Sequence, residues 1–115
     1  MVNTIYTLEN IRDIVNPIAN KYKVESIYLF GSYARGDADK SSDLDFLVFG
    51  GENFKLTNIF ALAEELRKAF KIPVDVFEIS EINTDSDFYS NIMNERLNIA
   101  WNILINNVFR KYVNI

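Results

Sequence analysis

Residues 24–50 read VESIYLFGSYARGDADKSSDLDFLVFG, and this stretch decides the fold. The segment Val24 to Phe30 is rich in β-branched and aromatic residues and stops at Gly31, which predicts a strand that ends in a turn. Residues 36–42 are polar and predict a loop. The segment Leu44 to Phe49 is apolar at nearly every position, as in a strand covered on both faces.

Helical patterns flank this stretch on both sides. Thr7 can cap a helix that continues to Tyr22, and Pro17 predicts a kink or two short helices near residue 16. Lys55 to Phe70 has the spacing of an amphipathic helix, and Ile72 to Ile79 reads as a third strand. Asp85 to Val113 is mostly helical in pattern, with a break expected near residues 94–98.

The alternation of helices and strands predicts one α/β (α+β) domain over residues 1–115, with a small mixed sheet and flanking helices. The chain has 115 residues and a formal net charge of −4, which fits one domain and argues against broad neutralisation of nucleic-acid phosphates. No membrane-spanning run or secretory signal is visible, so we expect a cytoplasmic protein.

The composition restricts the chemistry that the chain can perform. It contains 0 histidines and 0 cysteines, which excludes disulfides, thiolate catalysis, a histidine general base and metal sites built on imidazole or sulfur. Any catalysis must therefore use carboxylates, hydroxyls, lysine or arginine.

Gly31 and Ser32 form the first candidate site. Glycine lets a ligand approach the backbone closely, free N–H groups after a strand can bind an anion, and the serine hydroxyl adds another donor. The pair could cradle a phosphate, and the alternative is an ordinary turn.

Three acids form the second candidate site. Asp43 and Asp45 are two residues apart at the start of a strand and so point to the same face. Asp75 lies inside an apolar strand, where an acid needs a compensating cation. The alternatives are a solvated strand end for the first two and a buried ion pair for Asp75.

Taken together, these acids favour divalent cations. Two carboxylates about 4 Å apart repel by roughly 4 kcal/mol at an effective dielectric constant near 20. Ligation by oxygen alone selects Mg²⁺ or Mn²⁺. Two such ions beside a phosphate cradle suit phosphoryl or nucleotidyl transfer from a nucleoside triphosphate.

The spacing of these residues resembles that of a known family. Gly31-Ser32, ten residues, and then Asp43-x-Asp45 is similar to the signature of DNA polymerase β-type nucleotidyltransferases. The surrounding residues 31–37 and 42–45 resemble more closely the minimal nucleotidyltransferases (MNT), small proteins often encoded beside HEPN-domain partners. The resemblance covers residues 24–80 and, by length, the whole domain.

The resemblance implies a polymerase β-like fold and roles for individual residues. The nucleotide would be bound by Gly31, Ser32, Arg35 and Ser42, with ATP as the substrate; Asp43, Asp45 and Asp75 would be catalytic and would hold two Mg²⁺ ions, with Asp75 also assisting the incoming hydroxyl. Lys40 could be a further cation near the triphosphate. The alternative for Arg35 is a pair with a neighbouring acid, Asp37 or Asp39.

The resemblance also implies a partner. MNT antitoxins transfer AMP to a tyrosine of their HEPN toxin, so we expect the same reaction here, without membrane or direct nucleic-acid binding. Two alternatives stay open: a non-catalytic antitoxin that acts by complex formation, and a nucleotidyltransferase with a small-molecule acceptor.

The C-terminal third departs from the family pattern because residues 94–99 contain no glycine. An apolar stripe at helical spacing runs along it, formed by Leu97, Trp101, Leu104, Ile105, Val108 and Tyr112 and widened by Ile99 and Ile103. This stripe is either ordinary core or an interface for a homodimer or a HEPN partner.

Overall fold

The computed structural model describes residues 5–101 of the chain. In order, its elements are α1 (Leu8–Tyr22), β1 (Ser26–Phe30), α2 (Ser32–Arg35), β2 (Leu44–Phe49), η1 (Leu56–Asn58), α3 (Ile59–Ala69), β3 (Val74–Glu78), η2 (Ile79–Glu81), α4 (Asp87–Glu95) and β4 (Leu97–Trp101). Among the helices of this part of the chain, none has both the length and the apolar character that crossing a bilayer requires.

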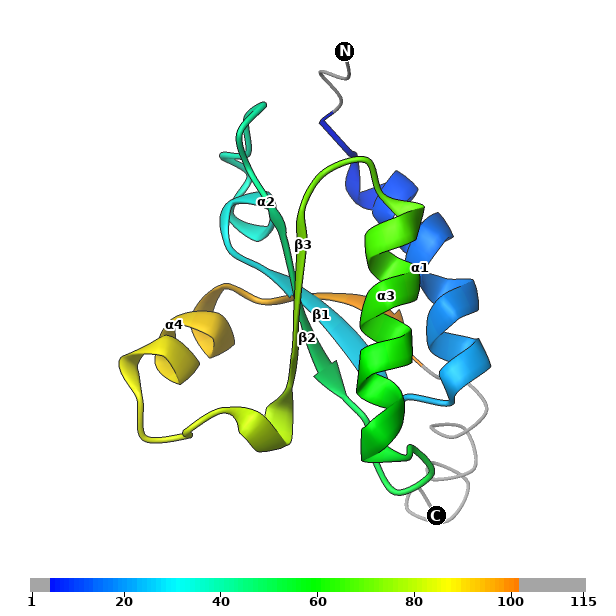
Figure 1. The fold of residues 1–115 in the computed structure, drawn as a ribbon. Helices are drawn as coiled ribbons and strands as arrows, with labels where there is room; N and C mark the ends of the chain where they lie inside the picture. The colour runs from blue at the N-terminus through cyan, green and yellow to red at the C-terminus, as the bar shows by residue number, and fades with distance from the viewer. Residues whose placement is uncertain (1–4, 102–115) are drawn as a thin grey trace, which may run out of the picture.

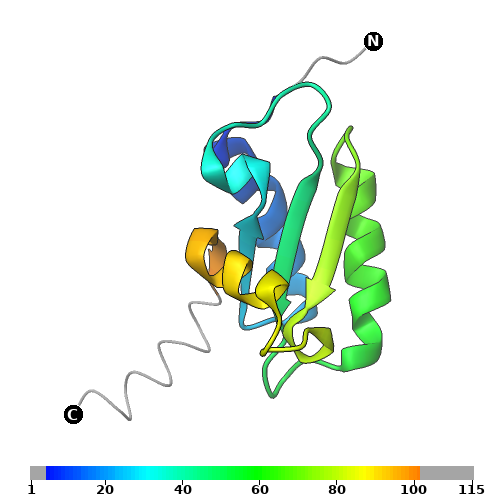
Figure 2. The same cartoon turned by 90° about the vertical axis from the view of Figure 1, so that its left-hand side faces the viewer.

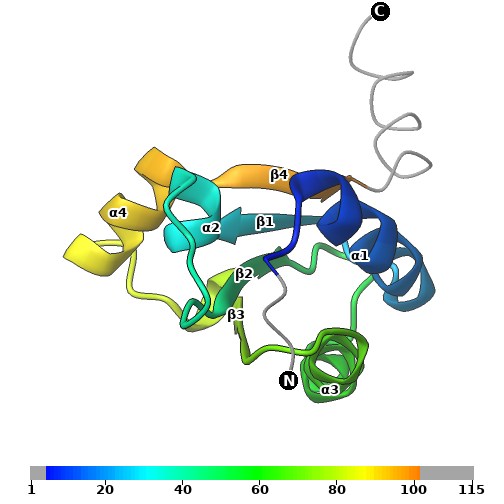
Figure 3. The same cartoon turned by 90° about the horizontal axis from the view of Figure 1, so that it is seen from above.

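The four strands form one mixed sheet in the order β3-β2-β1-β4. β1 pairs antiparallel with both β2 and β4, whereas β2 and β3 run parallel. Helices α1 and α3 pack on one face of the sheet and α4 lies on the other (Figures 1 and 3). The short helix α2 follows the end of β1, and its Tyr33 joins the apolar cluster on the α1 side. The prediction of a small mixed sheet with flanking helices is confirmed.

Apolar side chains that point alternately to the two faces of the sheet form two apolar clusters, one on each face. In β2, Leu44, Phe46 and Val48 face α1 and α3, where they join the larger cluster with Leu62 and Leu66. Leu47 points to the other face, where the smaller cluster includes Ile92 of α4. Asp45 points to the same face as Leu47 but lies nearer the start of the strand. Figure 2 shows α4 crossing the face beyond it, toward the ends of the β2 and β3 arrows.

Of the two alternatives predicted at Pro17, two short helices is wrong, because α1 continues through the proline as one helix of 15 residues. Ile11 and Val15 before the proline and Ala19 after it are all buried, so both halves of the helix pack against the core. Pro17 itself is exposed, and the side chain of Asn16 donates to the carbonyl of Arg12 at 2.9 Å. Tertiary contacts on the buried face therefore outweigh the local cost of the proline. The predicted cap is confirmed, since Asn10 N donates to Thr7 Oγ1 at 3.0 Å.

The C-terminal prediction is partly wrong. Residues 87–95 are helical, but Leu97–Trp101 form strand β4 instead of continuing the helix. Pairing with β1 and the burial of Ile99 and Ala100 favour the strand over the helical periodicity. The expected break near residues 94–98 marks this change of element. The remainder of the predicted stripe, including Leu104, Ile105, Val108 and Tyr112, lies outside the described residues.

Candidate active site

The turn after β1 lies against the first acid of β2. Gly31 has φ +76° and ψ −157°, a backbone conformation essentially restricted to glycine. A Cβ atom added there would overlap the carboxylate of Asp45 and would lie 3.3 Å from its Cγ. Glycine is therefore required both for the backbone angle and for the close approach of Asp45. This packing brings the two halves of the sequence motif together.

The third acid lies beside Asp45 on the neighbouring strand. Asp45 and Asp75 are register partners on the parallel strands β2 and β3, so their side chains leave the same face of the sheet. Asp75 is exposed on an edge strand, and the expectation that it is buried in an apolar strand is wrong. Asp43 precedes β2 and is also exposed. The candidate site thus opens to solvent where the acids lie.

The pKa of the Asp45 carboxyl reflects both its burial and the charges around it. Burial raises the pKa of its carboxyl to about 6, and the negative charges of Asp75, Asp43 and Glu95 add to the rise, while Arg35 opposes it. A half-buried carboxylate near three other acids favours either a proton or a cation. At neutral pH, a bound cation would stabilise the charged form of this carboxyl.

These residues fit a magnesium-nucleotide complex better than an all-protein metal site. Within residues 5–101, no three carboxylates converge closely enough to form a metal site by themselves. Magnesium in nucleotide-dependent enzymes is usually held by one or two carboxylates together with substrate phosphates. The adjacent Asp45 and Asp75, with Asp43 at the rim, match that donor set.

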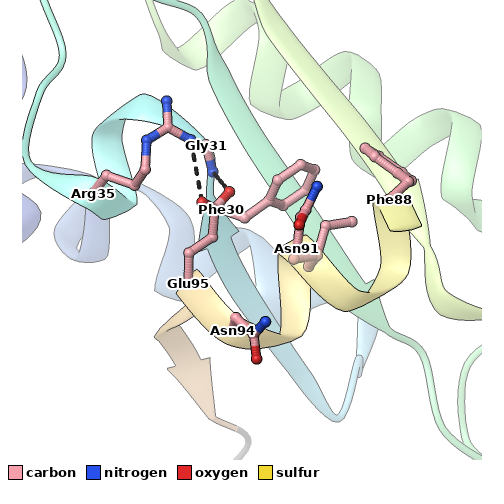
Figure 4. A pocket seen from close by; sticks show the side chains of 8 residues that line it. Phe30, Gly31, Arg35, Phe88, Asn91, Asn94 and Glu95 are labelled. Atoms are coloured by element: carbon pink, nitrogen blue, oxygen red, sulfur yellow. Dashed lines mark hydrogen bonds and ion pairs between the residues drawn. The ribbon is translucent and has the colours of Figure 1, made fainter. Parts of the chain in front are cut away.

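Arg35 and Glu95 form an unpredicted ion pair at the turn. The Glu95 carboxylate accepts from Gly31 N at 2.9 Å through Oε1 and pairs with Arg35 Nη1 at 3.1 Å through Oε2 (Figure 4). Arg35 also contacts Asp37 at 3.4 Å, as the alternative for this residue anticipated. An anionic group therefore occupies two of the donors that were expected to bind the triphosphate.

The remaining predicted residues lie around the loop between α2 and β2. Ser32 is half-buried at the first position of α2. The Ser42 hydroxyl is engaged with Asp39, whose N–H donates to Ser42 Oγ at 2.8 Å. Lys40 is exposed in the same loop. The structure thus brings Gly31, Arg35 and the acids together and ties Ser42 to its own loop.

Sequence reasoning did not find Glu95, which enters the site from α4, 60 residues beyond Arg35 along the chain. Its only local signal is its place at the end of a helix that precedes the predicted break. Glu78, on the face of β3 opposite Asp75, is buried at 6% exposure and caps η2. Its carboxylate accepts from Ser80 N at 2.7 Å and Gly50 N at 3.2 Å, which explains its burial without a catalytic role.

Comparison with known proteins gives a family match over most of the chain. The sequence model of the family described as "Polymerase beta, Nucleotidyltransferase" matches residues 12–102. A relative from Methanocaldococcus jannaschii, named "Putative protein adenylyltransferase MJ1379", is 37% identical over 83 residues. The matched region covers 67% of this chain and 83% of the relative.

Two solved structures share the fold. One, described as "Structure of putative minimal nucleotidyltransferase", superposes with a TM-score of 0.65 at 25% identity and covers 82% of this chain and 97% of that one. The other, from Shewanella oneidensis, is a tri-AMPylated HEPN toxin in complex with an MNT antitoxin. Its matched chain has a TM-score of 0.62 at 18% identity, with coverage of 94% and 85%.

Proposed function

The chain belongs to the polymerase beta nucleotidyltransferase family, and on that premise we propose that it transfers AMP from ATP to a protein hydroxyl. The acceptor is a tyrosine of a HEPN-domain toxin, and the chain acts as the antitoxin. The observation that carries this proposal is the meeting of Asp45 with both Gly31 and Asp75 on one face of the sheet. The names of the relatives support the acceptor class.

The reaction needs an acceptor oxygen, an α-phosphorus and a leaving group in line. The acceptor oxygen forms a bond to the α-phosphorus, the bond from that phosphorus to the bridging oxygen breaks, and pyrophosphate leaves. The hydroxyl proton passes to a carboxylate, and Asp75 is the candidate because it is exposed beside Asp45. The products are the AMP ester of the hydroxyl and pyrophosphate.

The remaining residues bind and orient the nucleotide. Gly31 N–H and the Arg35 guanidinium, now held by Glu95, bind triphosphate oxygens when the nucleotide enters. Ser32 adds a hydroxyl donor at the same turn. Asp43, Asp45 and Asp75 would hold Mg²⁺, with Mn²⁺ as an alternative, and the metal would neutralise charge on the phosphates.

A labelled transfer assay tests this proposal. The protein is incubated with Mg²⁺, ATP labelled at the α-phosphate and a purified HEPN-domain partner, and the labelled residue is mapped by mass spectrometry. We expect label on a partner tyrosine. Asp43→Asn combined with Asp45→Asn should abolish transfer, whereas Asp13→Asn on the exposed side of α1 should not.

Two results would contradict the proposal. If the double variant leaves the partner unlabelled yet silences its toxicity as well as the natural protein does, the chain acts as a non-catalytic binding module. If label reaches only small hydroxyl compounds, the acceptor is not a protein.

A further inference from the structure

A cavity of about 370 Å³ lies between the end of β1 and helix α4, directly beside the proposed phosphate-binding donors. We call it the base pocket; its lining residues are Phe30, Gly31, Arg35, Phe88, Asn91, Ile92, Asn94 and Glu95 (Figure 4). Its volume lies at the lower end of the range for small-molecule sites. Gly31 also packs against Asp45 of the active site.

The walls of the pocket combine aromatic rings with a side-chain amide. Phe88, Asn91 and Glu95 follow one another along one side of α4, at helical spacing. The Phe88 ring contacts Phe30 and Phe77, with ring centroids 5.9 and 5.5 Å apart. Yet Phe88 remains 43% exposed, so part of its apolar surface is free to pack against a ligand.

The position of the pocket specifies its occupant. Gly31 and Arg35 belong both to the pocket lining and to the set of proposed triphosphate donors. A nucleotide whose phosphates reach these donors and the acids of β2 therefore has its nucleoside end within reach of α4. A planar, polar-edged ring matches the lining, because aromatic side chains stack on bases and an asparagine amide can both donate to and accept from a base edge.

We propose that this pocket receives the nucleobase of the nucleoside triphosphate. Phe88 packs against the base, and the Asn91 amide hydrogen-bonds its polar edge. An asparagine amide can pair with a donor and an acceptor that lie side by side on a base edge, as on adenine. This inference rests on the proposed function and adds to it the residues that contact the base.

Binding measurements with two ligands separate the base from the phosphates. Dissociation constants for ATP and inorganic tripolyphosphate are measured with Mg²⁺ by calorimetry. Asn91→Ala removes the amide from an exposed position on α4 and should weaken ATP binding about three- to tenfold, the effect of one lost hydrogen bond. Tripolyphosphate binding should stay unchanged.

Two further variants test the aromatic wall. Phe88→Ala should weaken ATP binding with no change for tripolyphosphate, and Phe88→Leu, which keeps an apolar side chain in the aromatic cluster, guards against loss of folding. Asn20→Ala and Phe60→Ala are matched controls, because both residues are exposed on the helices of the opposite face. Circular dichroism confirms that each variant is folded.

Each remaining outcome has a defined meaning. Unchanged ATP binding in the Asn91 and Phe88 variants would overturn the base pocket but leave the proposed function intact. Equal weakening of ATP and tripolyphosphate would also overturn it, since the effect would then lie in the phosphate site. If the natural protein binds neither ligand, the proposed function fails and the base pocket fails with it.

Discussion

At the scale of single residues, Gly31 joins the two halves of the motif. Its backbone angles are close to exclusive to glycine, and a side chain there would meet Asp45. Gly31→Ala should therefore lower the free energy of unfolding by about 3 kcal/mol, measured by urea denaturation. Gly36→Ala is the control, since Gly36 also has a positive φ, +82°, but a Cβ added there would meet no atom within 4 Å. This substitution should lower the free energy of unfolding by only about 1 kcal/mol. Equal costs would mean that contact with Asp45 is unimportant.

The raised pKa of Asp45 predicts how the stability of the folded protein depends on pH. Because burial and neighbouring acids raise the pKa of Asp45 to about 6, the folded protein holds this proton more tightly than the unfolded chain does. The stabilising effect of the proton is present below about pH 4 and is lost as the pH rises through about 6. Asp45→Asn removes this loss.

Melting temperatures of the free protein in EDTA test that prediction. Asp45→Asn should melt higher than the natural protein at pH 7, with a much smaller difference at pH 4, and most of the change should occur between pH 4 and 6. Asp13→Asn on α1 should show no such trend. A difference that does not vary with pH would show that the effect of the substitution on stability does not come from the charge on Asp45.

At the scale of elements, local patterns predicted the strands of the motif well. The predicted strand Leu44 to Phe49 matches β2, because a strand covered on both faces is apolar at nearly every position and this run is visible in the sequence. β4 was missed because its pairing partner β1 lies about 70 residues earlier, so its stability is not visible locally. The two short helices predicted at Pro17 are wrong for the same reason: contacts with the core on both sides of the proline keep α1 continuous.

The residues of the candidate site also fall into two groups, those that the sequence predicted and those that only the structure shows. Gly31, Asp43 and Asp45 are close in sequence and have a recognisable spacing, and the parallel pairing of β2 with β3 then brings Asp75 beside Asp45. Glu95 and the lining of the base pocket come from α4, whose packing across the sheet cannot be inferred from periodicity alone.

The position of Glu95 at the end of α4 leads to a prediction about triphosphate binding. The Glu95 carboxylate at its end competes with the triphosphate for Gly31 N–H and Arg35. Glu95→Gln keeps an oxygen acceptor for Gly31 but removes the charge, so Mg²⁺-tripolyphosphate should bind about fivefold more tightly, corresponding to about 1 kcal/mol of relieved repulsion. Calorimetry measures the change, with Glu64→Gln on the exposed side of α3 as the control. Weaker binding would instead identify Glu95 as a residue that positions Arg35.

At the scale of the whole molecule, the absence of histidine and cysteine concentrates the proposed chemistry on acids that repel one another in the free protein. Binding of ATP and Mg²⁺ should therefore increase the stability of the folded protein. With ATP and Mg²⁺ at about 100 times the dissociation constant, mass action adds about 2.7 kcal/mol. For a domain of this size, that gain corresponds to a melting temperature about 10 °C higher.

The contributions of the metal and the acids can be separated in the same experiment. Mg²⁺ alone should give a small shift, because the carboxylates of residues 5–101 do not form a complete metal site without phosphate oxygens. ATP with EDTA should also give a small shift, since the triphosphate then adds its charge to that of Asp45, Asp75 and Asp43. The double variant Asp43→Asn with Asp45→Asn should lose the additional shift that Mg²⁺ gives to ATP. If ATP stabilises the natural protein equally with Mg²⁺ and with EDTA, the acids are not metal ligands, and their crowding around Asp45 needs another explanation.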